Sequence, residues 1–298
     1  MKGLNFKVAQ RDDYRRLASW LVQVSQSPEH HCLHTWSGQS AEDLREQFLS
    51  YLDDFELCYV TAVWDGRLVG AMGSEYDEDL ERSWLHGPHV VAKDWEPIAT
   101  QLFTRLLAEL PTCIRQLDAY LNIENKLGRH FYTQRGFKER EHLNYDFWLK
   151  PEERVVSDGK DCPLLEKDQE ISFMQLYKTI FPSAYYDPDR ILDMIGQSHQ
   201  VLVVEQGKQV LGFVVVSVEG DQSVGEIQFL GVRENYRHQG YGTRLLLSAI
   251  DWLFDRAGVI RVCLNVAEEL VYARDLYESV GFRLRFTGIG LEKKLSRK

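Results

Sequence analysis

Two glycines, Gly240 and Gly242, lie in a short basic segment between a predicted strand and a predicted helix. The strand is rich in β-branched and aromatic residues. The helix has apolar residues at helical spacing until Gly258, a typical C-terminal stop. Glycine lets the backbone approach a ligand closely, and the free N–H groups of a helix N-terminus attract anions. The pattern predicts a pyrophosphate-binding turn made of Arg237, His238, Gln239, Gly240, Tyr241, Gly242 and Thr243.

The spacing of these glycines excludes two common phosphate loops. The segment has no Gly-Lys-Ser/Thr sequence, and it lacks the third glycine and the βαβ context of a dinucleotide fingerprint. Arg233 to Arg244 contains three arginines and one glutamate, a charge of +2, whereas the whole chain has 35 basic and 45 acidic side chains and a net charge of −10. An acidic chain repels nucleic acid and favours cationic substrates such as amines. We therefore expect a local anion site and no nucleic acid partner.

The basic segment also follows a strand that ends in Leu230, Gly231 and Val232. Read as Arg/Gln-x-x-Gly-x-Gly/Ala after Leu-Gly-Val, it resembles the signature of the GCN5-related N-acetyltransferases. The sequence LYESVGF, Leu276 to Phe282, stands where that family has its last characteristic helix, and the resemblance spans about Leu164 to Leu295. It implies an α/β (α+β) fold with a mixed central sheet flanked by helices, in which two splayed strands expose backbone to the pantetheine arm of acetyl-CoA.

The resemblance assigns the cofactor contacts. Leu230, Gly231 and Val232 would offer main-chain groups to the pantetheine, as an added strand does at a sheet edge. The turn from Arg237 to Thr243 would hold the pyrophosphate. The family commonly has asparagine seven residues before the tyrosine of its last helix, where this chain has Leu270. We expect Asn265 on the preceding strand to substitute for that amide.

The resemblance also assigns the catalytic groups. Glu226 would be the general base that takes a proton from an ammonium substrate, and period-2 alternation places it on one strand face with Gln228 and Leu230. Tyr277 would protonate the departing CoA thiolate, because a phenol is a reasonable acid for an alkyl thiol. The alternatives are a solvated strand glutamate and a tyrosine that only packs against Leu276 and Phe282.

The chain contains an internal repeat. The strand–turn–strand patterns at Cys58–Ser74 and His199–Ser217 match at an offset of 142, and FYTQRGF matches LYESVGF at an offset of 145. A polar stretch at about 150–160 separates the halves, so the predicted domains are residues 1–150 and 160–298. Each half is expected to start with helices, followed by the hairpin, a strand, a long helix, a strand, a short helix and a terminal strand pair.

The first half resembles the family over about Asn5 to Leu149, mainly in fold order and in Asn125 to Phe137, where Asn125 keeps the residue that Leu270 lacks. An offset of 144 aligns Lys93–Ile98 with the basic turn, and a glutamate, a proline and an isoleucine then replace the open backbone there. The same offset places Pro88 against Val232 and Arg82 against Glu226. We therefore expect no cofactor site in this half, which would serve as a packing partner and substrate wall.

Five widely spaced cysteines, with no CxxC pair and no histidine at ligand spacing, favour a reducing cytoplasm without structural zinc. The cluster His30, His31, Cys32, His34 and Trp36 is interpreted as exposed polar sequence and not as a metal site. The apolar runs fall far short of the roughly 18 residues of a membrane span, and the first residues lack the apolar core of a signal peptide. No membrane partner is expected.

The sequence thus predicts a cytoplasmic tandem acetyltransferase, monomeric with two similar halves or a homodimer. Its substrates would be acetyl-CoA and a primary amine of a small molecule or peptide, which attacks the acetyl carbonyl directly. No metal is required. Two alternatives remain, a non-catalytic acyl-CoA-binding sensor and a protein-interaction module, because the basic turn alone does not demand catalysis.

Overall fold

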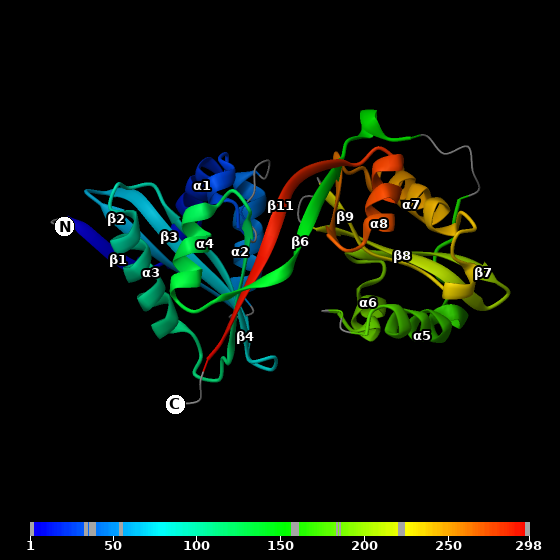
Figure 1. Cartoon of the computed structure of the whole chain (residues 1–298), viewed down its shortest axis with the longest axis horizontal. Helices are drawn as coiled ribbons and strands as arrows, with labels where there is room; N and C mark the ends of the chain where they lie inside the picture. The colour runs from blue at the N-terminus through cyan, green and yellow to red at the C-terminus, as the bar shows by residue number, and fades with distance from the viewer. Residues whose placement is uncertain are drawn as a thin grey trace. The chain divides into compact units, whose positions relative to one another are not determined.

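The computed structural model describes residues 3–32, 35, 40–53, 56–155, 161–182, 184, 186–219 and 224–295 (Figure 1). The chain divides into two compact units. Unit 1 contains Met1–Leu143 and Thr287–Lys298, and unit 2 contains Asn144–Phe286. None of the helices in the described ranges combines the length and apolar character that crossing a membrane requires.

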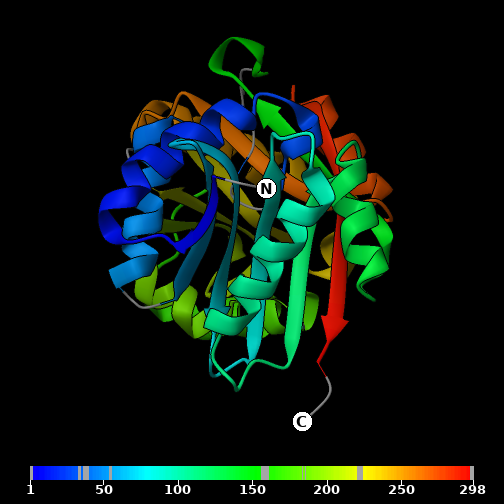
Figure 2. The same cartoon turned by 90° about the vertical axis from the view of Figure 1, so that its left-hand side faces the viewer.

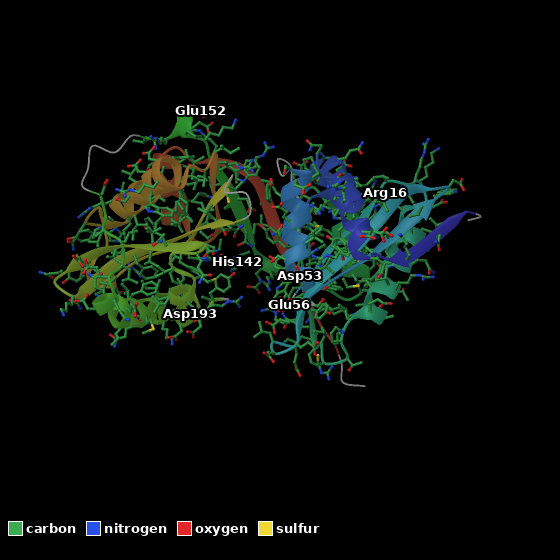
Figure 3. The ribbon with its side chains drawn as sticks, turned by 180° about the vertical axis from the view of Figure 1, so that it is seen from behind. Arg16, Asp53, Glu56, His142, Glu152 and Asp193 are labelled. Carbon is green, nitrogen blue, oxygen red and sulfur yellow. The ribbon has the colours of Figure 1, made fainter. Side chains whose placement is uncertain are left out.

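Unit 1 is a mixed sheet with helices on both faces. Helix α3 packs on one face against a core that includes Ile98, Leu102 and Leu106, and α1 and α2 pack on the other face (Figure 2). Exposed charged residues such as Arg16 and Asp53 lie on α1 and at the end of α2 (Figure 3). The elements are β1 (Leu4–Val8), α1 (Tyr14–Val24), α2 (Ala41–Asp53), β2 (Leu57–Trp64), β3 (Arg67–Asp77), β4 (Arg82–Val90), α3 (Trp95–Glu109), β5 (Gln116–Asn122), α4 (Lys126–Gln134) and β6 (Lys138–Leu149).

Unit 2 repeats this architecture. Helices α7 and α8 cover one sheet face, while α5 and α6 cover the other. The elements are α5 (Glu170–Ile180), α6 (Pro188–Met194), β7 (His199–Gln206), β8 (Gln209–Glu219), β9 (Val224–Val232), α7 (Tyr241–Asp251), β10 (Arg261–Ala267), α8 (Val271–Ser279) and β11 (Arg283–Lys294).

The repeat predicted from sequence is confirmed by where matching elements begin. The hairpin begins at Leu57 in unit 1 and at His199 in unit 2, which is the predicted offset for the hairpins. Helices α4 and α8 begin at Lys126 and Val271, which is the predicted offset for the short helices.

Helix α7 forms where the sequence predicts it. Gly240 precedes it with a positive φ of 81°, and Leu245, Leu246 and Ile250 are fully buried against the sheet. Burying side chains of this size contributes about 1.5–3 kcal/mol each. The helix continues into a π-helical segment at Trp252–Ala257, and Gly258 ends it at φ 74°. The burial of α7 against the sheet fixes the position of the basic turn that precedes the helix.

Strand β6, the last strand in the first half of the sequence, completes the sheet of unit 2. Strand β11, the last strand in the second half, completes the sheet of unit 1. The strand order is β1-β2-β3-β4-β5-β11 in unit 1 and β6-β10-β9-β8-β7 in unit 2. Residues 144–149 of β6 pair antiparallel with β10, and residues 288–294 of β11 pair antiparallel with β5.

The sequence pattern therefore differs from the structure in two respects. The compact units do not follow the predicted division at 150–160, because the strands β6 and β11 cross it, and residues 156–160 of the predicted linker lie outside the described residues. Each half also ends in a single strand of 12 residues and not in a strand pair.

Candidate functional site

Strands β9 and β10 of unit 2 diverge partway along their length. They pair in parallel only between Val224–Glu226 and Arg261–Cys263. Beyond Glu226, the described part of β9 pairs with β8 alone as far as Val232. The backbone edge of β9 that faces β10 is thus unpaired by strand hydrogen bonds over its second half.

The direction of the backbone groups on β9 follows from its pairing with β8. The N–H of Arg233 donates to the carbonyl of Leu211 at 2.8 Å. Because antiparallel residues alternate in direction, the groups of Gly231 also point to β8, where Gly231 pairs with Phe213. Those of Leu230 and Val232 point into the gap. Consistently, the Val232 carbonyl accepts a hydrogen bond from Arg237 Nε at 3.1 Å.

Gly231 therefore has a different role from the one predicted for it. A Cβ on this residue would lie 2.8 Å from Ile180 Cδ1, a side-chain carbon of α5, and 3.2 Å from the Phe213 ring. The glycine gives β9 room beside α5, while Leu230 and Val232 present the backbone groups.

The basic turn lies directly after this strand and is open to solvent. Residues Arg237 to Gly240 are exposed, and His238 and Gly240 both have positive φ, of 60° and 81°. The first helical hydrogen bond of α7 runs from Arg244 N to Gly240 O at 3.0 Å. The N–H groups of Tyr241, Gly242 and Thr243 precede it, so the turn presents the donors of a helix N-terminus.

None of the described residues lies so close to Gly242 that it requires a glycine there. A Cβ there would meet only Leu276 Cδ2, at an ordinary 3.5 Å, and the residue does not have positive φ. Gly240, by contrast, has a backbone conformation that favours glycine. A methyl group therefore fits at Gly242 at the start of α7.

A β-bulge in β9 changes which side chains share a face. The pairing with β8 shifts between Val215–Phe229 and Val216–Ile227, so Gln228 is an extra residue. Ile227 lies in the core under α7, whereas Phe229 lies in the core under α5. The prediction that Glu226, Gln228 and Leu230 share one face is therefore wrong. Leu230 packs on the α7 face, and Glu226 and Gln228 lie on the α5 face.

Glu226 is part of a polar row on the α5 face. His199, Ser217 and Glu226 occupy paired positions on β7, β8 and β9. The His199 ring contacts Gln228 Oε1 through Nε2 at 3.0 Å, and Gln228 Nε2 donates to Glu226 Oε2 at 3.4 Å. The Ser217 hydroxyl is buried and has no hydrogen-bond partner among the described residues.

The sequence did not point to His199 and Ser217 as part of this row. They lie on β7 and β8, and only the register between these strands and β9 shows that they are beside Glu226. The only signal was their polar character within otherwise apolar strand patterns.

Tyr277 on α8 is buried, with 8% of its surface exposed. Burial raises the pKa of its phenol to about 12. Its counterpart Tyr132 in unit 1 donates to the Gly87 carbonyl at 2.8 Å. No such bond involves the Tyr277 hydroxyl in the described part of unit 2, where burial is the sole cause of the pKa shift.

The start of α8 differs from the start of α4. In unit 1, Asn125 Oδ1 accepts from Gly128 N at 2.9 Å and caps α4. In unit 2 the N-cap position is Leu270, without a side-chain cap. Asn265 does not replace that cap, because it is exposed and donates to Asp146 Oδ1 on β6 at 3.0 Å. The expectation that Asn265 takes over the family's asparagine is therefore not met at the helix.

The matching region of unit 1 has a different register from the one that an offset of 144 gives. Strands β4 and β9 begin at Arg82 and Val224, so Trp84 matches Glu226 and Pro88 matches Leu230. This strand register corrects the predicted pairings of Arg82 and Pro88.

The helix that follows also departs from the predicted offset of 144, but in the direction opposite to that of the strand. Helices α3 and α7 begin at Trp95 and Tyr241, so Glu96 matches Gly242. The reason is a shorter turn before α3, which spans 91–94 where unit 2 has 233–240. Glu96 forms an ion pair with Arg135 at 2.9 Å beside this helix start.

The diverging strands of unit 1 are bridged by its own chain. Strands β4 and β5 pair only at Arg82–Leu85 and Gln116–Ala119. Beyond that point Cys32 forms a β-bridge with Leu121, and the His31 carbonyl accepts from Asn122 N at 3.2 Å.

Cys32 also contacts the other strand. Its Sγ accepts a hydrogen bond from Gly87 N of β4 at 3.0 Å. The segment around Cys32 thus takes up, in unit 1, the strand edges that remain unpaired in unit 2.

This segment is not the exposed polar loop that the sequence suggested. His31 and Cys32 are 3% and 1% exposed. Burial raises the pKa of the Cys32 thiol to about 11, so the thiol is protonated at neutral pH. His34 and Trp36 of the same cluster lie outside the described residues. Within the described ranges no group of three or more His, Cys, Asp or Glu side chains is arranged to hold a metal.

Comparison with known proteins agrees with this geometry. Residues 170–282 match the model of the acetyltransferase (GNAT) family. A stretch of 86 residues is 30% identical to a mycothiol acetyltransferase from Renibacterium salmoninarum, but it covers 28% of this chain and only about a quarter (25%) of that relative.

Solved structures match over nearly the whole chain. A GCN5-related N-acetyltransferase from Sphaerobacter thermophilus superposes with a TM-score of 0.76 over 99% of this chain and 96% of its own, at 16% identity. A tandem GNAT protein from the clavulanic acid biosynthesis pathway superposes with a TM-score of 0.68 over 99% of both chains, at 14% identity. Identities this low show the fold alone. The chain therefore has the fold of the tandem GNAT proteins, and its residues 170–282 match the model of the acetyltransferase (GNAT) family.

Proposed function

We propose that unit 2 transfers an acetyl group from acetyl-CoA to a primary amine of a small molecule or peptide. One observation supports this best. The edge of β9 at Leu230 and Val232, which β10 does not pair with, leads directly to the open N-terminus of α7, within the region that matches the family. An extended pantetheine arm pairs with such a strand edge, and a pyrophosphate binds such a helix start.

Glu226 is the proposed general base. It lies at the last paired position before β9 and β10 diverge, and Gln228 orients its carboxylate by donating a hydrogen bond. The carboxylate accepts a proton from the acceptor's ammonium group, and the neutral amine attacks the acetyl carbonyl. The acceptor therefore approaches from the α5 face, on which Glu226 lies.

Two groups handle the charge that moves during transfer. As the amine nitrogen bonds to the acetyl carbon, negative charge develops on the carbonyl oxygen, and the backbone N–H groups of β9 near Leu230 stabilise it. The tetrahedral intermediate loses the second amine proton to solvent, the C–S bond breaks, and the CoA thiolate leaves. The Tyr277 hydroxyl donates a hydrogen bond to that thiolate.

The test is thiol release from acetyl-CoA in the presence of a panel of amines. Thermal stabilisation by acetyl-CoA alone, about 2.7 kcal/mol at 100 times the dissociation constant, reports binding separately. Gly242→Glu reproduces the residue found at the matching place in unit 1, and it sets a carboxylate against the pyrophosphate. We expect it to abolish the stabilisation by acetyl-CoA.

Gly242→Ala is the matched control, because a Cβ fits there without a close contact. It should retain most of the binding. Equal stabilisation of the wild type and Gly242→Glu would overturn the proposed pyrophosphate site. Binding of acetyl-CoA without thiol release on any amine would instead favour a non-catalytic acyl-CoA sensor, and absence of binding would favour an interaction module.

A further inference from the structure

An apolar patch is exposed at the start of α8 in unit 2. Leu270, Val271 and Tyr272 expose 53%, 44% and 85% of their surfaces. The Tyr272 ring contacts one other ring, that of His238 in the basic turn, edge to face with centroids 6.5 Å apart. The patch is therefore continuous with the candidate pyrophosphate site.

Stability does not explain these residues. At the matching place in unit 1, Asn125 caps the helix, whereas Leu270 leaves the first N–H groups of α8 without a side-chain cap. Losing an N-cap side chain weakens a helix, and an exposed tyrosine recovers little of this because it is not buried. The uncapped helix start at Leu270 and the exposed Tyr272 ring therefore stabilise neither the helix nor the core, and they lie together beside the candidate pyrophosphate site.

The chemistry of the two neighbouring surfaces identifies their ligand. The turn offers the backbone donors of a helix N-terminus and the exposed guanidinium of Arg237, which suit phosphate groups. The patch offers an aromatic face and aliphatic side chains, which suit a planar ring. A ligand that meets both carries a flat base joined to phosphates, as a nucleotide does.

We propose that the Tyr272 ring, supported edge to face by His238, forms a stacking platform for the adenine ring of CoA. This inference rests on the proposed function and adds a contact to the nucleotide end of the same substrate. Base–aromatic stacking tolerates different bases, since every base has a π-face. The platform therefore raises the affinity for the nucleotide part of CoA and leaves the pantetheine part unaffected.

The experiment compares two ligands on the full-length protein by calorimetric titration. CoA contains the adenine, whereas pantetheine 4′-phosphate contains the pantetheine arm and one phosphate without the base. Tyr272→Ala should weaken CoA binding by about 5- to 150-fold, the range that loss of one base–aromatic stack produces. Its binding of pantetheine 4′-phosphate should be unchanged.

Three further variants act as controls. Tyr272→Phe keeps the ring and should bind CoA as the wild type does. His238→Asn removes the second ring, tolerates the positive φ, and should weaken CoA binding less than Tyr272→Ala. Leu127→Ala changes the matching residue of unit 1, which is 57% exposed, and should have no effect. Because Tyr272 is 85% exposed, its replacement leaves the fold intact.

An unchanged CoA affinity in Tyr272→Ala would overturn the platform, and so would an equal loss for both ligands. If Tyr272→Ala changed only the KM for the acceptor, the patch would bind the acceptor, and the proposed adenine platform would be wrong as well. Failure of the wild type to bind either ligand would overturn the proposed function itself, so the two failures are distinguishable.

Discussion

At the scale of single residues, the Tyr277 phenol is a hydrogen-bond donor more than an acid. Burial raises its pKa to about 12, several units above the pKa of about 8.5 that an alkyl thiol such as cysteine has in water. Proton transfer from the phenol to the thiolate is therefore unfavourable, and the thiolate takes its proton from solvent. In the proposed mechanism Tyr277 therefore contributes a hydrogen bond to the departing thiolate and not a proton.

Tyr277→Phe should lower kcat by roughly 10- to 100-fold, the share of one hydrogen bond to a charged group. The donor is the protonated form, and because its pKa is raised, that form persists as pH increases to about 11. The pH profile of kcat should therefore contain no alkaline limb from Tyr277 below that pH. A limb near pH 9 that disappears in the phenylalanine variant would contradict this role.

Glu226→Gln should lower turnover at neutral pH by roughly 100- to 10,000-fold, because general acid–base catalysis contributes that much. The affinity for acetyl-CoA should stay nearly unchanged, since the carboxylate lies on the α5 face, away from the pyrophosphate turn. Steady-state kinetics and calorimetry measure the two quantities. Glu205→Gln, an exposed glutamate on β7, is the control and should behave as the wild type. Turnover of Glu226→Gln within a few fold of the wild type would show that another group accepts the proton of the ammonium substrate.

At the scale of elements, local patterns were predictable and pairings between strands were not. The basic turn could be predicted because its glycines and the helix after it are encoded within a few neighbouring residues. The face shared by Glu226, Gln228 and Leu230 could not, because the bulge at Gln228 depends on where β8 pairs, and Glu226 to Phe229 alternates between polar and apolar residues as an unbulged strand does. His199 and Ser217 were missed for the same reason.

The segment around Cys32 gives unit 1 a pH-sensitive element. Burial lowers the pKa of His89 to about 3, assisted by the nearby histidines His30, His86 and His31. The His89 ring lies 3.4 Å from Cys32 Sγ and 3.3 Å from Thr35 Oγ1, so it holds the segment that bridges β4 and β5.

Unit 1 should lose stability as pH falls. In the unfolded chain His89 takes up a proton near pH 6.5, whereas in the folded unit it stays neutral to about pH 3. Protons therefore favour the unfolded state across this window, by several kcal/mol at its lower end. Hydrogen exchange in β5 at pH 7 and pH 4.5 measures the loss. His89→Gln should be less stable at pH 7 but less sensitive to acid, whereas His142→Gln, on β6 (Figure 3), should leave the acid sensitivity unchanged.

At the scale of the whole molecule, the crossing of β6 and β11 makes each unit depend on the distant part of the sequence. Ile289 and Leu291 of β11 are buried in the core of unit 1, and Phe147 and Leu149 of β6 are buried in the core of unit 2. Neither half of the sequence therefore contains a complete sheet. No local pattern could reveal this, because the sequence of a terminal strand is equally compatible with pairing to the sheet of its own half.

Ile289→Ala should destabilise unit 1 by about 2–5 kcal/mol, although the residue lies near the end of the chain. Phe147→Ala should destabilise unit 2 by about 3–5 kcal/mol, although it lies in the first half of the sequence. Hydrogen exchange should show the loss of protection in β5 for the first variant and in β10 for the second. Protection lost in the opposite units would contradict the strand assignment.

Each chain should bind one acetyl-CoA. In unit 1 the segment around Cys32 pairs with the strand edge that a pantetheine arm would need, and Glu96 occupies the matching helix start. Calorimetric titration counts the sites directly. A stoichiometry near two would show that the ligand displaces this segment.

The exchange of terminal strands also governs the order in which the protein is made. During synthesis the first part of unit 1 leaves the ribosome early, yet residues 288–294, which complete its sheet, are translated only after unit 2. Until they arrive, β5 has an unpaired edge and the core lacks Ile289 and Leu291. Folding of the N-terminal unit therefore finishes only after residues 288–294 have left the ribosome, and a nascent chain stalled before residue 288 would expose that edge to chaperones and aggregation.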